Sequence, residues 1–270
     1  MNKKSKENIL KFTVLITFLI MLLVNALANL LPINGITTGE VSDAYANLFA
    51  PAAVTFSIWG LIYLLLAAYT LYLFGLFNEE REKSLIQLRS ISINFAVSSV
   101  ANALWIFSWH YRIIWLSVLL MIILLLCLVR INKISGKLTL SVKEKFFIKL
   151  PFSVYFGWIT VATIANVTAF LVSLGWGGFG LPESFWTVIM IIIGTLIGNG
   201  VILRHKDMAY GLVLVWAYIG ILIKHLSNYG FAGEYPSVIV ATSFCIVVIL
   251  LDITYMLLSK HKKIKLDTRP

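Results

Sequence analysis

Long apolar stretches set the pattern of hydrophobic and polar positions along this chain. Runs of about twenty residues, the length that crosses a bilayer as a helix, recur from end to end between short polar connections. They predict an all-α, polytopic membrane protein with about eight transmembrane helices. The fourth run is almost uniformly Leu and Ile from Leu116 to Val129, which predicts a lipid-facing scaffold helix. The expected spans are residues 10–31, 52–76, 91–110, 112–130, 150–173, 184–203, 208–226 and 236–258.

One narrow face of the fifth span combines two aromatic residues, a small residue and an amide. Spacings of three and four residues keep these side chains in line on a helix. The amide would lose its water hydrogen bonds without replacement if it faced lipid, so this face is expected to point inward. It suits either close helix packing or a pocket for a flat apolar ligand, and the sequence leaves both readings open. The four residues are Tyr155, Trp158, Ala162 and Asn166.

The second and third spans carry similar stripes. Trp59 and Tyr63 lie one turn apart, and by helical rise from Pro51 the tyrosine is too deep for an interfacial aromatic belt. Asn25 and Asn29, four residues apart near the end of the first span, put two amides on one face that is also expected to point inward. Three stripes that face one another would enclose a cavity. The stripe on the third span consists of Asn94, Ser98, Asn102, Trp105 and Trp109.

Together these patterns resemble the tryptophan-rich sensory protein and translocator protein family, TspO/MBR. On its second helix that family has a proline eight residues before a Trp and a Tyr four after it. It has Asn-x-x-Trp on the third helix and Tyr-x-x-Trp-x-x-x-Ala-Thr-x-x-Asn on the fifth. The matching residues are Pro51, Trp59 and Tyr63, then Asn102 and Trp105, then Tyr155, Trp158, Ala162, Thr163 and Asn166.

The resemblance covers roughly residues 10 to 173. Family members are typically five-helix proteins, so residues 1–173 are expected to form a TspO/MBR-like five-helix core. Residues 174–270 are expected to form a three-helix membrane extension with a basic cytoplasmic tail. The chain departs from the family in having only Pro51 in place of a proline cluster, and Ile106 where a serine follows the third-helix Trp.

The resemblance implies a ligand and the residues that hold it. The ligand class is a flat, mostly apolar small molecule, a tetrapyrrole such as a porphyrin or a sterol-like compound, bound for sensing or transport. The Trp59 and Asn102 donors are expected to orient the polar edge of this ligand. No cofactor is expected. The implied ligand-binding residues are Trp59, Tyr63, Asn102, Trp105, Tyr155, Trp158, Ala162 and Asn166.

A small-solute transporter or permease is the alternative, and it rests on the last three spans. Asp252 falls inside the eighth span, where an acid is costly unless it is paired, hydrated or protonated. Such a residue is a candidate for proton-coupled transport, but an ion pair with Arg204 or Lys206 would also explain it. Gly194 and Gly198 on the sixth span favour close helix packing.

The positive charges alternate between connections. Of the 22 Lys and Arg residues, all but Arg112 and Lys224 fall at the two ends and near every second connection. Short positive loops stay on the cytoplasmic side, so both termini and the 131–149 connection are expected to be cytoplasmic in a multi-pass protein of the cell membrane. The net charge of +10 does not indicate nucleic acid, because no folded basic domain surrounds these residues.

The sequence does not predict an enzyme. It has no Ser/His/Asp set, metal-binding cluster or phosphate-binding loop. Cys127 and Cys245 each lie inside a span and are interpreted as small buried hydrophobes. His225 is too isolated to be nominated as a ligand or catalyst. The expected partners are the apolar ligand and the lipid bilayer, with a homodimer left open.

Overall fold

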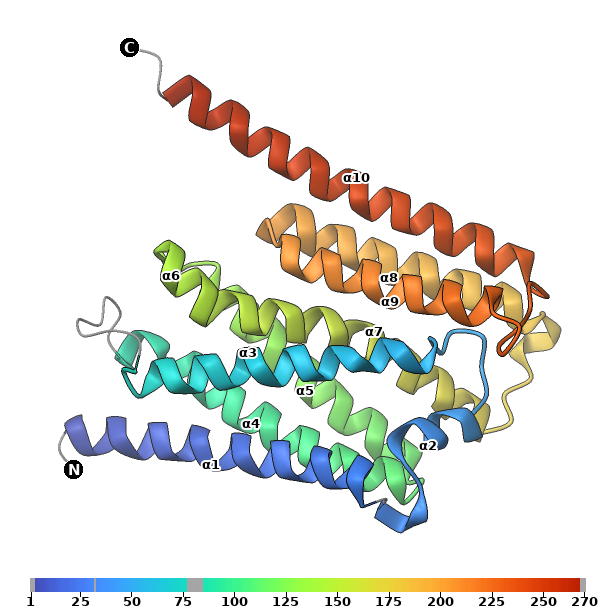
Figure 1. Ribbon diagram of the computed structural model, residues 1–270, viewed down its shortest axis with the longest axis horizontal. Coiled ribbons are helices and arrows are strands. Elements are labelled where there is room, and N and C mark those ends of the chain that lie inside the picture. The colour runs from blue at the N-terminus through green and yellow to red at the C-terminus, as the bar shows by residue number, and fades with distance from the viewer. Residues whose placement is uncertain (1–2, 32, 77–84, 268–270) are drawn as a thin grey trace. The chain divides into compact units, whose positions relative to one another are not determined.

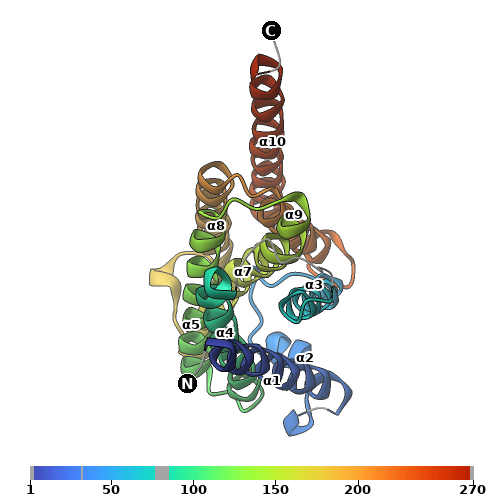
Figure 2. The same ribbon diagram turned by 90° about the vertical axis from the view of Figure 1, so that its left-hand side faces the viewer.

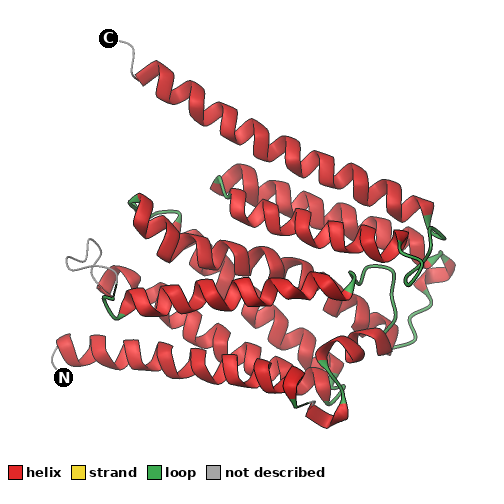
Figure 3. Ribbon diagram, viewed as in Figure 1, coloured by secondary structure: helices red, strands yellow, loops and turns green. Residues whose placement is uncertain are grey.

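The computed structural model describes residues 3–31, 33–76 and 85–267, and in these residues the regular elements are helices (Figures 1 and 3). Eight helical stretches in them are long and apolar enough to cross a membrane, which confirms the predicted all-α polytopic class. The long helices are α1 (Lys3–Leu30), α3 (Ile58–Leu73), α4 (Leu85–His110), α5 (Ile114–Ser135), α7 (Leu150–Ser173), α8 (Glu183–His205), α9 (Met208–Leu226) and α10 (Pro236–Asp267). Shorter elements are η1 (Ile33–Gly35), α2 (Thr38–Ala44), η2 (Ala53–Ser57), α6 (Val142–Glu144), η3 (Lys145–Lys149) and η4 (Gly178–Gly180).

The chain forms two compact units. Unit 1 comprises Met1–Ala46 and Ser57–Gly175, and unit 2 comprises Asn47–Phe56 and Trp176–Pro270. Unit 2 therefore contains α8, α9 and α10 together with a short segment that precedes α3 in the sequence. Nothing in the sequence pattern suggested that this segment belongs with the C-terminal helices.

In unit 1, α4 packs against both α1 and α5, and α7 packs against α5 and α3 (Figure 2). The prediction that α5 is a lipid-facing scaffold helix is wrong for one side of the helix, which is buried. Ser117, Leu124 and Leu128 are fully or almost fully buried on it. A helix that is apolar all round gives no sign of which face meets protein, and here that face packs between α4 and α7.

Two short helices of unit 1 begin with reciprocal side-chain caps. Thr37 accepts a hydrogen bond from the Glu40 backbone N–H, and the Glu40 carboxylate accepts one from the Thr37 backbone N–H at 2.6 Å. These bonds to the charged form hold the pKa of Glu40 below its ordinary value. Ser141 and Glu144 cap α6 in the same way. The caps satisfy backbone donors that have no partner within the helix.

In unit 2, glycines let α8 and α9 approach closely, as expected for Gly198. A Cβ added at Gly198 would collide with Leu214 of α9, and one added at Gly211 would lie 2.8 Å from Ile202 Cδ1 of α8. The Tyr218 hydroxyl also donates to the Ile191 carbonyl at 2.7 Å and joins the two helices.

Candidate ligand-binding site

Four aromatic side chains from α3 and α7 form a continuous cluster in unit 1. The rings of Trp59 and Tyr63 stack with centroids 5.4 Å apart and planes inclined by 20°. The edge-to-face partners of Trp59 are Tyr155, at 5.9 Å, and Trp158, at 6.3 Å. These offsets are the geometries that aromatic quadrupoles favour. The structure therefore brings together four of the residues that the resemblance implied, and we call them the aromatic cluster.

A chain of two amides and a hydroxyl ties this cluster to the neighbouring helices. Asn25 of α1 donates from Nδ2 to Asn102 Oδ1 at 2.7 Å, and Asn102 Nδ2 donates to the Tyr155 hydroxyl at 3.2 Å. All three side chains are buried. The inward orientation expected of Asn25 is confirmed, but the same expectation is wrong for Asn29, which is exposed and donates to the Asn25 carbonyl of its own helix. The hydrogen bonds fix the position of Tyr155 against Trp59.

Asn166 and Ala162 lie along the same helix but differ in what they contact. Asn166 is buried, and its Nδ2 donates to Ser117 Oγ of α5 at 3.0 Å. That amide therefore serves the packing of α5 against α7, one of the two readings left open for the stripe. Ala162 is partly exposed, as are Trp59 and Tyr63 of the aromatic cluster.

Trp105 lies one turn beyond Asn102 on α4 and stacks on Trp109, with ring centroids 5.6 Å apart. The Trp109 indole N–H donates to the Thr38 carbonyl at 3.2 Å. The Trp105 indole N–H is buried and makes no hydrogen bond with the described residues. The two tryptophans therefore form a separate pair next to the amide chain.

Asp252 lies on α10, inside the candidate span Pro236–Ser259, with a partly exposed side chain. The expected ion pair with Arg204 or Lys206 is not found, and Asp252 has no hydrogen bond or ion pair to any side chain in the described part of the chain. The neutralising partner that would make this acid purely structural is thus missing among those residues.

Unit 2 contains a polar cluster that sequence reasoning missed. His225 donates from Nε2 to the Leu48 carbonyl at 2.9 Å, and the Leu48 N–H donates to the Glu183 carboxylate at 2.8 Å. Leu48 belongs to the segment of residues 47–56. Further along this segment, the Thr55 carbonyl accepts a hydrogen bond from the Trp216 indole N–H of α9 at 3.0 Å. Leu48 and Thr55 take part in these bonds through backbone groups, which leave no pattern in the sequence. These contacts hold residues 47–56 against α8 and α9.

Comparison with known proteins gives one match. A model of the family described as TSPO-like protein matches residues 11–255. No curated protein and no solved structure matches the chain. The matched stretch includes α8, α9 and most of α10, so it is longer than the roughly 10 to 173 over which the sequence analysis placed the resemblance.

Proposed function

Because the chain belongs to the TSPO-like protein family, we propose that this integral membrane protein binds a flat, mostly apolar small molecule of the porphyrin or sterol-like class within unit 1. The observation that carries the proposal is the aromatic cluster of Trp59, Tyr63, Tyr155 and Trp158. Flat apolar ligands bind against aromatic faces and edges of this kind. The proposed role is binding for sensing or transport, and no residue is assigned to catalysis.

The partly exposed members of the site provide the surface for the ligand. Trp59 and Tyr63 present the stacked rings, and Ala162 provides room because its side chain is a single methyl group. Tyr155 and Trp158 are buried behind Trp59 and keep its ring in place. In this arrangement the ligand covers the Trp59–Tyr63 stack and lies over Ala162.

The polar end of the ligand would meet the amide chain. A side-chain amide has two donor hydrogens and an oxygen with two lone pairs. Asn102 uses one hydrogen on Tyr155 and accepts one bond from Asn25, so it keeps one donor and one lone pair. Asn102 can therefore donate one further hydrogen bond to the ligand and accept one from it, both from a fixed position.

Two substitutions that act oppositely on the volume of the site test this proposal. Trp158→Ala removes an aromatic wall, and Ala162→Phe fills the space beside it. We expect each to weaken protoporphyrin binding by about fivefold, since removing an aromatic contact, or displacing the ligand from one, costs about 1 kcal/mol. The measurement is quenching of tryptophan fluorescence of the purified protein during titration with protoporphyrin.

The controls introduce the same new residues, alanine for a tryptophan and phenylalanine for a smaller side chain, away from the aromatic cluster. Trp115→Ala removes a tryptophan that is 61% exposed on α5, and Val172→Phe adds a ring at an exposed position near the end of α7. Both should bind protoporphyrin with the affinity of the unchanged protein. Equal affinity in all four variants would rule out the aromatic cluster as the site.

Proton-coupled solute transport is a second candidate function, and Asp252 favours it. An acid inside a membrane span that has no counter-charge among the described residues is suited to gaining and losing a proton during a transport cycle. This function concerns α10 in unit 2 and does not depend on the aromatic cluster.

A further inference from the structure

The connection between α7 and α8 contains no charged residue. Residues 174–182 read Leu-Gly-Trp-Gly-Gly-Phe-Gly-Leu-Pro, in which the Trp176 indole is the only polar side-chain group. Candidate spans end at Ser173 and begin again at Glu183, so a connection this short lies at the bilayer surface. Connections exposed to water usually carry polar side chains. This composition indicates that the connection lies in an environment less polar than water.

Side-chain contacts hold this connection in one conformation. The Trp186 indole N–H, from the first turn of α8, donates to the Gly178 carbonyl at 2.9 Å. The Trp186 ring also packs on Trp176, with centroids 4.9 Å apart. Gly178 has φ +60°, and a Cβ there would lie 3.1 Å from the Trp186 nitrogen, so glycine suits both the backbone and the contact. The connection is a built structure that presents its remaining side chains in fixed directions.

Phe179 has the most exposed large hydrophobic side chain of this connection, at 83%. Its backbone has φ +54°, a left-handed conformation that is unfavourable for a bulky residue. Leu181 and Phe185 beside it are each 46% exposed. We call Trp176, Phe179, Leu181 and Phe185 the aromatic tip. In water, these exposed apolar side chains would be unfavourable, because no burial would compensate for their hydration.

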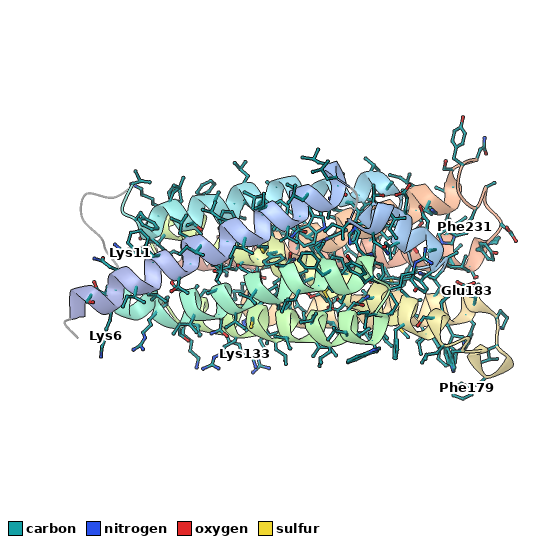
Figure 4. All side chains as sticks on the ribbon, turned by 90° about the horizontal axis from the view of Figure 1, so that it is seen from below. Lys6, Lys11, Lys133, Phe179, Glu183 and Phe231 are labelled. Atoms are coloured by element: carbon teal, nitrogen blue, oxygen red, sulfur yellow. The ribbon has the colours of Figure 1, made fainter. Side chains whose placement is uncertain are left out.

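The charged side chains of α8 are either bonded within the protein or far from the aromatic tip, as an apolar environment for the tip requires. The nearest carboxylate in the sequence, Glu183, accepts a hydrogen bond from the Leu48 N–H and is thereby engaged by the protein. Figure 4 shows Phe179 and Glu183 at the same end of unit 2. The basic residues of α8, Arg204 and His205, are in its last turn, at its opposite end.

We propose that the aromatic tip inserts into the boundary between the headgroups and the acyl chains of the bilayer, so that its partner is the lipid surface. Phe179, Leu181 and Phe185 would enter the acyl region, and the Trp176 indole N–H would donate to headgroup or ester oxygens, the position that amphipathic aromatic rings prefer. The two flanking spans already place this connection at that depth. Lipid is therefore the occupant favoured over a second protein.

The test places an environment-sensitive fluorophore at the tip. Phe179→Cys labelled with NBD is reconstituted in phosphatidylcholine vesicles, and Asn228→Cys in the exposed α9–α10 connection is the matched control. We expect the NBD emission at position 179 to be blue-shifted relative to position 228 and quenched by lipids that carry a doxyl group near the carbonyl. Aqueous iodide should quench position 228 more strongly. Leu181→Cys, which has an ordinary φ of −87°, reports on the same tip if Phe179→Cys does not fold.

Two results would overturn the proposal. Strong iodide quenching at both positions, without quenching by doxyl lipids, would show that the tip lies in water. A blue-shifted emission that neither quencher reduces would show that protein covers the tip. Labelling of the protein without an introduced cysteine measures the background from Cys127 and Cys245, which are both buried.

Discussion

Asn102 links three helices of unit 1 through one side chain. It lies on α4, accepts from Asn25 of α1 and donates to Tyr155 of α7. Hydrogen bonds between membrane helices contribute about 0.6 to 2 kcal/mol each, because the separated helices also find partners in the membrane. The larger effect is on geometry. Tyr155 is held by its hydroxyl while its ring contacts Trp59, so the amide chain helps to fix the partly exposed rings of the aromatic cluster.

Asp252 gives the prediction that separates ligand binding from transport. Because no ion pair is lost with the described residues, Asp252→Asn should leave the unfolding temperature unchanged or raise it, since a charge within the membrane is costly. Protoporphyrin affinity should also stay unchanged, because the aromatic cluster is built from α3 and α7. The measurements are thermal unfolding, protoporphyrin titration and proton-driven solute uptake, with Thr254→Val on the same helix as the control. Loss of uptake at unchanged stability would establish the transport function.

At this scale the sequence predicted which residues turn inward but not what they bind. Helical spacing and the cost of burying an amide place Asn102, Tyr155 and Asn166 on inner faces, and all three are buried. The bonds of Asn102 to Asn25 and of Asn166 to Ser117 depend on the rotation and crossing of whole helices. A single chain carries no signal for those quantities.

The segment Asn47–Phe56 shows what the glycines of α9 do. It lies against α9 so closely that a Cβ at Gly220 would collide with the Thr55 side chain, and the Ala52 N–H donates to the Gly220 carbonyl at 3.0 Å. His225, one turn and a half further along α9, holds Leu48 of the same segment. Unit 2 is thus a three-helix assembly with a strap, residues 47–56, that ends in the 3-10 helix η2 and is bonded to α8 and α9.

Gly220→Ala should therefore destabilise the protein by about 1 to 3 kcal/mol, the usual cost of forcing a methyl group into a packed contact. Gly200→Ala is the matched control, because a Cβ at that position on α8 meets open space. It should be neutral or stabilising by up to about 1 kcal/mol, since alanine favours the helix over glycine. Thermal unfolding of the two variants in the same detergent compares them. Equal unfolding temperatures would mean that the strap does not pack on α9 as described.

The positions of the helices in the sequence were predictable, because length and hydropathy determine them. Which side of each helix packs against protein was not predictable from those two quantities. Each of the eight expected spans corresponds to one observed span, with ends that mostly agree within five residues and one start, at Val142 instead of residue 150, that lies earlier. For α5, a uniform run of Leu and Ile left its buried side invisible. The strap was missed because it bonds to α8 and α9 through its own backbone carbonyl and N–H groups, which every residue offers.

For the molecule as a whole, the distribution of positive charge carries a prediction about orientation. Within unit 1, Lys6 and Lys11 of α1 and Lys133 of α5 lie toward the same end (Figure 4). Positive connections stay in the cytoplasm during insertion, so this end and both termini are expected to be cytoplasmic. The α9–α10 connection is then expected on the opposite side.

Cysteine labelling in cells tests this orientation. Ser135 is 3% exposed and unsuitable, but Lys137 in the α5–α6 connection is exposed, as is Asn228 between α9 and α10. A membrane-impermeant maleimide should label Asn228→Cys in intact cells and Lys137→Cys only after permeabilisation. Thr268→Cys, which lies outside the described residues, should behave like Lys137→Cys. Labelling of Lys137→Cys but not Asn228→Cys in intact cells would reverse the orientation and show that the charge bias does not govern insertion of this chain.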